Sequence, residues 1–250
     1  MIISVMSPAL SENSNFDITF QGVQFGENGA KAVSMLNEKG TEFYIHSFQY
    51  MGDLSIQTLV PSSSYGMSWG NAHEVNTYGS GWTDKPVAGY IPTSIEIYFV
   101  CVPEGNTIIR DIDHAVLCGG YYEFSSASVN EMFDDLKIKL TKVYGTPSDI
   151  GDENILYKFF GEPDSVVLWT AFSVEEYFAV WEGNNGYIVL CRSDYTDEDS
   201  MYDDTVSITY ISKDIDSLVE KAVKVATKQA QREAYEEESQ IYGNDDTDGL

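Results

Sequence analysis

The sequence predicts an α+β fold, in which one or more antiparallel sheets pack against about three helices. Segments rich in β-branched and aromatic residues fill most of the chain, whereas apolar residues recur at helical spacing in only three places. Residues 182–186, Glu-Gly-Asn-Asn-Gly, separate two apolar runs as a hairpin turn does. Because several strand segments follow one another with no helix between them, an antiparallel sheet is favoured over a parallel one.

The clearest helix is predicted over residues 128–144. Ser128 and Glu131 have the spacing of a capping box, in which each side chain bonds the backbone N–H of the other residue. Gly145, followed closely by a proline, marks the end of this helix. The apolar positions at helical spacing, which we expect to face the core, are Val129, Met132, Phe133, Leu136, Leu140, Val143 and Tyr144.

Two other helices are expected, one on each side of this helix in the sequence. The first covers about residues 28–39 and is closed by Gly40. Its inward-facing residues are Ala32, Val33 and Leu36. The second begins near Asp214 and loses its apolar face at residue 226. Because the polar remainder has little to bury, we expect residues 226–250 to form a disordered acidic tail.

The predicted strands occupy most of the remaining chain. They cover residues 16–20, 54–60, 94–102, 165–172, 177–181, 186–192 and 205–212. Each of the first two predicted helices follows one strand and precedes several others. This order indicates two copies of a helix-plus-antiparallel-sheet unit, and ordinary recurrence of strand-like sequence is the alternative. The expected organisation is a leader or signal-peptide remnant at 1–15, a globular body at 16–225 with candidate halves 16–114 and 115–225, and the tail at 226–250.

Two segments of the chain resemble a known class of protein. Residues 23–40 combine an apolar strand end, Gly26 and a helix, and residues 139–149 end a helix in aromatic-Gly-x-Pro. This pattern resembles small bacterial envelope α/β modules of the outer-membrane assembly lipoprotein E and β-lactamase inhibitor protein type. The resemblance implies helices packed on an antiparallel sheet, and a protein-binding role without catalysis.

The chain is strongly acidic, with 40 acidic and 14 basic side chains and a formal net charge of −26. Residues 1–225 hold 33 of the acidic and 12 of the basic side chains, so the acidity belongs to the globular body and not only to its tail. A surface this acidic repels phosphate backbones and anionic lipid head groups, and we expect no nucleic-acid partner and no membrane insertion. The same charge attracts a cationic protein by electrostatic steering.

The cysteines and the N-terminus bear on the compartment of the protein. Cys101, Cys118 and Cys191 lie in apolar runs, which predicts buried free thiols, with one disulfide and an odd thiol as the alternative. Buried free thiols favour a reducing compartment. Residues 2–9 match the end of a signal peptide if the natural start lies upstream. We therefore expect a cytoplasmic protein for the sequence as written, and a secreted one for an upstream start.

Three motif matches lack the context that their chemistry needs. The G-x-S-x-G elbow around Ser68 is neither preceded directly by a strand nor followed by an amphipathic helix. His73 and Glu74 begin a zincin motif that lacks its second histidine. An acidic cluster between two predicted strands offers oxygen ligands to calcium, although a solvated hairpin tip is the simpler explanation. Its candidate ligands are Asp194, Asp197 and Asp199.

The strongest functional signal lies in residues 61–86. This segment is long for a loop inside a compact domain, carries only three formal charges, and sets four large aromatic residues among serine, glycine and asparagine. That composition is typical of recognition loops, and a self-packed Ω-loop and a mobile insertion are the alternatives. The candidate binding residues are Tyr65, Trp69, Tyr78 and Trp82.

Three functions from different classes fit these observations. The leading hypothesis is a non-enzymatic binding or inhibitory protein, similar in role to an immunity protein, that recognises a protein partner through the aromatic loop, with a basic partner favoured by the charge. An extracellular glycan-binding or accessory protein using Trp69 and Trp82 is the first alternative. A serine hydrolase centred on Ser68 is the second. We expect no catalytic residue, no metal and no cofactor.

Overall fold

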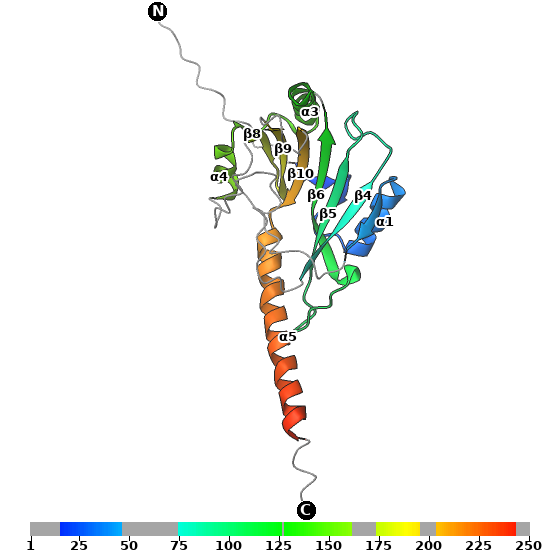
Figure 1. Cartoon of the computed structure of the whole chain (residues 1–250), viewed down its shortest axis with the longest axis vertical. Helices are drawn as coiled ribbons and strands as arrows, with labels where there is room; N and C mark the ends of the chain where they lie inside the picture. The colour runs from blue at the N-terminus through cyan, green and yellow to red at the C-terminus, as the bar shows by residue number, and fades with distance from the viewer. Residues whose placement is uncertain (1–15, 47–74, 127, 162–173, 196–203, 244–250) are drawn as a thin grey trace, which may run out of the picture.

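The computed structural model of this chain describes residues 16–46, 75–126, 128–161, 174–195 and 204–243. Its strands are β1 Thr19–Phe20, β2 Val23–Gln24, β3 Glu42–Ile45, β4 Asn76–Trp82, β5 Ser94–Cys101, β6 Ala115–Ser125, β7 Asp149–Gly151, β8 Val174–Glu182, β9 Gly186–Tyr195 and β10 Thr205–Ser212. Eight of them form one antiparallel sheet in the order β3-β4-β5-β6-β10-β9-β8-β7, and β1 and β2 form a separate hairpin. The α+β prediction is therefore confirmed (Figure 1).

Four α-helices accompany the sheet within the described ranges. They are α1 Gly29–Glu38, α3 Val129–Tyr144, α4 Asn154–Phe160 and α5 Ile215–Gly243, and a 3-10 turn, Ile112–His114, precedes β6. Three of the helices match the predicted ones. The short helix α4 has no counterpart among the predicted elements.

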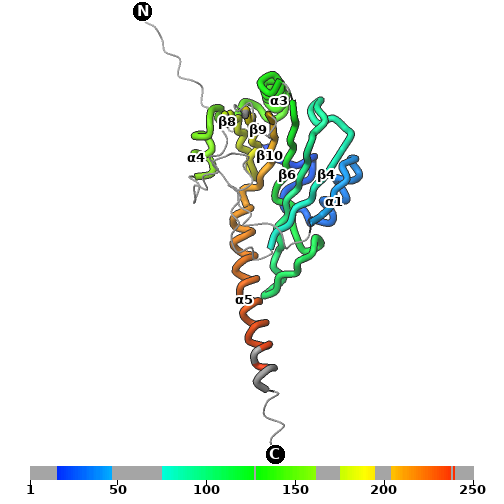
Figure 2. The backbone as a smooth tube through the Cα atoms, viewed as in Figure 1, coloured from blue at the N-terminus to red at the C-terminus, as the bar shows by residue number. Residues whose placement is uncertain are grey.

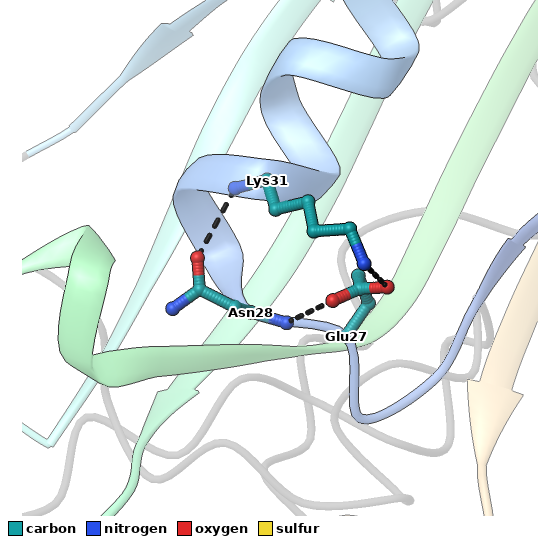
Figure 3. Close-up of polar contacts among 3 residues, drawn as sticks. All are labelled: Glu27, Asn28 and Lys31. Carbon is teal, nitrogen blue, oxygen red and sulfur yellow. Dashed lines mark hydrogen bonds and ion pairs between the residues drawn. The ribbon is translucent and has the colours of Figure 1, made fainter.

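The start of α1 is fixed by two consecutive polar residues (Figure 3). The Asn28 Oδ1 atom accepts a hydrogen bond of 3.1 Å from the backbone N–H of Lys31, which satisfies one free donor of the first turn. The Glu27 carboxylate accepts from the backbone N–H of Asn28 at 3.0 Å and pairs with the Lys31 ammonium at 2.7 Å. These local bonds explain why the predicted helix begins where it does.

Helix α3 buries five of the seven apolar positions predicted to face the core, whereas Val143 is 71% exposed and Tyr144 is half-buried. Its buried residues are Val129, Met132, Phe133, Leu136 and Leu140. Gly145 follows with a φ of 79°, a region that favours glycine. The predicted capping box is wrong, because the Ser128 side chain makes no capping hydrogen bond; instead the Ser128 backbone N–H donates to Ser126 Oγ at 3.0 Å.

Helix α5 departs from the prediction for the end of the chain. The sequence predicts fraying beyond residue 226, whereas the helix continues to Gly243. Apolar contacts hold its first turns, where Ile215, Ala222 and Ala226 are buried. The rest consists of good helix formers, with one i,i+4 bond from Gln229 to Glu233 at 2.9 Å. Figures 1 and 2 show this helix leaving the sheet and extending well beyond it.

The sheet is built from two runs of four strands that meet at β6 and β10. These two strands pair in antiparallel register from Thr205 opposite Ser125 to Ile211 opposite Gly119. Helix α1 precedes the run β3 to β6, and α3 precedes the run β7 to β10. In Figure 2 the chain passes from cyan to green on one side of this seam and from green to orange on the other. Each run of four strands thus follows one helix, α1 or α3, and the first run ends at Ser125.

The two faces of the sheet carry different elements. On one, which we call the hairpin face, Phe20 of the β1–β2 hairpin stacks on Tyr122 with ring centroids 5.0 Å apart. Helix α3 lies on this same face, where Phe133 meets Tyr177 at 5.7 Å. On the opposite face, which we call the α4 face, Phe160 of α4 packs against Tyr187 at 5.1 Å. Because side chains alternate along a strand, successive residues of each strand lie on opposite faces of the sheet.

Candidate functional site

The predicted binding residues fall into two groups. Tyr65 and Trp69 lie outside the described residues, while Tyr78 and Trp82 lie on β4. The motif residues Ser68, His73 and Glu74 and the calcium candidates Asp197 and Asp199 also lie outside the described residues.

Part of the predicted loop is a strand. Residues 76–82 pair with β3 on one side and β5 on the other, which corrects the interpretation of 61–86 as one continuous loop. Its glycines explain why the sequence did not resemble a strand. A Cβ on Gly79 would lie 2.7 Å from Ile45 Cδ1, and one on Gly81 would lie 2.6 Å from Phe43 Cδ1. The small residues therefore leave room for neighbouring side chains.

Strand β4 places Tyr78, Ser80 and Trp82 on the α4 face. The adjacent strand β3 adds Tyr44, which lies directly opposite Ser80. Trp82 is 65% exposed and Tyr44 is 71% exposed, so two large aromatic side chains stand in solvent on neighbouring strands. Large exposed aromatic groups that share one surface are typical of interaction sites.

His46 links Tyr44 to Tyr78. Its ring stacks on Tyr78 at 4.2 Å with an interplanar angle of 10°, and meets Tyr44 edge-on at 5.0 Å and 87°. His46 Nε2 lies 2.9 Å from Ser80 Oγ, in a hydrogen bond whose donor depends on the tautomer. We call Tyr44, His46, Tyr78 and Trp82 the aromatic patch. These contacts fix the rings of three of its four members before any partner binds, which lowers the entropy lost on binding.

Carboxylates border the aromatic patch. Glu42 lies opposite Trp82, and Glu96 of β5 lies opposite Ser80. Glu96 accepts a hydrogen bond of 2.6 Å from the Tyr98 hydroxyl. Burial raises the pKa of Tyr98 well above its usual value, and the charge of Glu96 adds to this effect, so Tyr98 stays protonated and donates. The patch is therefore aromatic at its centre and acidic at its border.

Sequence reasoning identified Tyr78 and Trp82 but missed Tyr44 and His46. Tyr44 lies on β3 and His46 directly follows this strand, but only the register of Tyr44 opposite Ser80 shows that they join the same surface as Tyr78 and Trp82. That register depends on residues 76–82 being a strand. The available signal was the alternation of Glu42, Tyr44 and His46 with the apolar Phe43 and Ile45.

The metal and cysteine expectations can be examined in the described part of the chain. There, no group of three or more histidine, cysteine, aspartate or glutamate side chains could hold a metal ion. Asp194, the one calcium candidate within this part, faces Glu175 across the β8–β9 pair. The three cysteines are buried free thiols, as the sequence predicts. The helices of the described ranges include none long and apolar enough to cross a membrane.

No protein-family model, no curated protein and no solved structure matches this chain.

Proposed function

We propose that this chain is a non-enzymatic binding protein that recognises a basic protein partner through the aromatic patch. The observation that carries the proposal is the exposure of Tyr44 and Trp82 beside a pre-arranged His46–Tyr78 stack. Interface hot spots are enriched in tryptophan and tyrosine, because these side chains bury a large area with few rotatable bonds.

The position of the patch in the sheet supports a protein partner. Among the described strands, β3 is the outermost on its side of the sheet. An outer strand offers backbone N–H and C=O groups beside its side chains, and an extended segment of another protein can use both. Strand β3 has only four residues, Glu42–Ile45, so a segment paired with it would form few backbone hydrogen bonds. The aromatic side chains would therefore supply most of the affinity.

The charge of the patch border favours a basic partner. Glu42 and Glu96 flank the aromatic residues, and the whole chain carries a net charge of −26. A cationic surface would meet complementary charge both at long range and at the contact itself. The weak resemblance to β-lactamase inhibitor type modules points to the same class of function.

The test is purification of a partner with the intact chain and with variants of the patch. We expect a basic protein that binds the wild type and loses at least about 2 kcal/mol of binding free energy, roughly 30-fold in Kd, with Tyr44→Ala and Trp82→Ala combined. The matched control is Tyr235→Ala, which removes an equally exposed aromatic side chain, 74% exposed, from α5. The purified pair is then measured by isothermal titration calorimetry at low and high salt.

Three outcomes would contradict the proposal. Equal affinity of the patch variant and the wild type would show that the partner binds elsewhere. An acidic partner, or affinity independent of salt, would contradict the charge argument. If a neutral oligosaccharide displaced the partner protein and Trp82→Ala lost sugar binding, the glycan-binding alternative would be favoured, because exposed tryptophan stacks well on sugar rings.

A further inference from the structure

A cavity of about 360 Å³ lies on the hairpin face of the sheet, opposite the aromatic patch. Its walls come from the β1–β2 turn, the end of α1, the segment that follows β4, and the end of α3, and its floor comes from β6 and β10. This volume lies within the range of small-molecule sites in proteins. Because so many separate elements converge on it, the cavity is a property of the folded protein and not of one loop.

Three of the lining residues are tyrosines. They are Tyr122 of β6, Tyr210 of β10 and Tyr144 of α3. The Tyr210 and Tyr144 hydroxyls lie near enough to shift each other's pKa, and the Gln21 amide lies near enough to lower that of Tyr122. Burial raises the pKa of Tyr122 and of Tyr210, so both phenols remain protonated and can donate hydrogen bonds.

The β1–β2 turn presents Gln21 to the cavity. Gln21 has a φ of 50° and Gly22 a φ of 73°, as a two-residue hairpin turn with both central residues left-handed requires. Gln21 Nε2 also donates to Thr41 Oγ1 at 3.1 Å, and Thr41 is buried. These bonds hold the amide of Gln21 at the cavity wall.

Two lysines complete the lining, and no lining residue is acidic. The Lys39 ammonium donates to the Gln21 carbonyl, and the Lys85 ammonium donates to the Lys39 carbonyl at 3.0 Å. Their sequence neighbours Glu38 and Asp84 are exposed, and in the described ranges neither ammonium forms an ion pair. An ammonium group has three donors, so each lysine keeps donors for a ligand.

We propose that this cavity binds a small organic anion, with a carboxylate or phosphate group at Lys39 and Lys85 and a hydroxyl-bearing body over the tyrosines. Lys39 and Lys85 line the same cavity with no acidic residue in its lining, and an anionic group would supply the counter-charge. The phenols, the Gln21 amide and the Thr41 hydroxyl suit a ligand with several hydroxyl groups. A cavity of 360 Å³ has room for a molecule the size of a monosaccharide phosphate.

The proposal does not rest on the proposed function. Strand alternation places Tyr122 and Tyr210 on the opposite face from Tyr78 and Trp82. The two sites therefore lie on different faces of the sheet, and Lys39→Gln and Tyr44→Ala test them separately.

The experiment is calorimetric titration of the full chain with four probes at low ionic strength. Glucose 6-phosphate and glucuronate carry the two candidate anionic groups, inorganic phosphate carries the anion alone, and glucose carries the hydroxyls alone. We expect glucose 6-phosphate or glucuronate to bind at least ten-fold more tightly than either glucose or phosphate. Whichever of glucose 6-phosphate and glucuronate binds more tightly identifies the preferred anionic group.

Variants then locate the binding site. Lys39→Gln combined with Lys85→Gln should raise the Kd of the tighter-binding probe at least ten-fold, which corresponds to about 1.4 kcal/mol. The matched control is Lys224→Gln combined with Lys228→Gln, which makes the same change of net charge on exposed residues of α5. Tyr144→Phe should weaken binding of the sugar probes and leave the affinity for inorganic phosphate unchanged. A thermal unfolding scan of each variant without ligand confirms that it folds.

The results that would overturn the proposal are equally concrete. Absence of binding of all four probes at millimolar concentration would show that the cavity is not an anion site. Glucose binding as tightly as its phosphate would contradict the role of the lysines. Loss of binding in the α5 control, with the cavity variant unaffected, would place the anion on α5 instead.

Discussion

A methyl group added at Gly120 of β6 would collide with a buried aromatic ring. A Cβ at this position would lie 2.5 Å from Cγ of Phe20, and closer still to two other carbons of the same ring. Ordinary carbon–carbon contacts are about 3.5–4.0 Å, so Gly120→Ala requires a movement of about 1 Å or more. Phe20 has no room to move, because it is fully buried between Tyr122 and Tyr210 at 5.0 and 5.6 Å.

The expected cost follows from these contacts. Overpacking a core costs about 1–3 kcal/mol, and the lower entropy of the unfolded alanine chain returns about 0.4–1 kcal/mol. Since three ring atoms are affected and the ring is fixed by two neighbours, we expect a net loss of about 2 kcal/mol. For a chain of this length that lowers Tm by roughly 4–8 °C.

The assay is urea unfolding followed by circular dichroism, within a double-mutant cycle. Phe20→Leu removes the ring that the new methyl group meets, so Gly120→Ala should cost much less in that background, with a coupling of about 1–2 kcal/mol. The control is Gly151→Ala on the edge strand β7, where a Cβ meets only one side-chain atom at 3.0 Å. Equal stability of Gly120→Ala and the wild type, or equal cost in both backgrounds, would refute the packing argument.

Two further predictions concern titratable groups. Burial raises the pKa of Cys101 to about 12, and it also raises the pKa of Cys118 and of Cys191. The native protein should therefore not react with a thiol reagent at pH 8, whereas all three thiols should react in urea. One fast-reacting thiol in the native protein would contradict this prediction. Hydrogen bonds from Lys139 and Tyr90 lower the pKa of Asp135, so its contribution to stability is present above the ordinary carboxyl pKa and is lost as the pH falls through the lowered value. Lys139→Gln should move the Asp135 pKa, followed by carboxyl NMR, back toward 3.8, and an unchanged titration would exclude the ion pair as the main cause.

The elements that sequence reasoning predicted well are those whose signals are local. Five buried positions of α3, the bounds of β5 and β10 and the start of β9 follow from periodicity and composition. The capping box at Ser128 failed because side-chain capping depends on how the preceding loop enters the helix, here with a Ser128 ψ of 62°. The extension of α5 has no apolar periodicity that would predict it, and part of its support comes from distant residues: Gln229 accepts from the Ile108 N–H and Arg232 donates to the Asn106 carbonyl.

The parts that could not be predicted depend on contacts between distant segments. Strand β4 contains two glycines, and only the side chains of Phe43 and Ile45 on β3 explain them. The aromatic patch was half predicted, because Tyr78 and Trp82 share a segment with a recognisable composition, whereas Tyr44 and His46 join them through strand register. The cavity had no signal at all, since its residues come from segments as distant as Gln21 and Tyr210.

The two proposed sites share one short stretch of chain, and this affects how their variants must be interpreted. Trp82 belongs to the aromatic patch, while the next residue, Thr83, lines the cavity and donates to the Gly40 carbonyl at 3.1 Å. Thr83 Oγ1 also accepts from the backbone N–H of Lys85 at 3.1 Å. A change at Trp82 or Lys85 can therefore displace the other site through the backbone, whereas Tyr44 and Lys39 lie outside this stretch. An effect on partner binding that Trp82→Ala shows and Tyr44→Ala lacks has two sources to separate, the lost indole contact and a displaced 82–85 segment. Unchanged anion binding by Trp82→Ala would assign the effect to the indole.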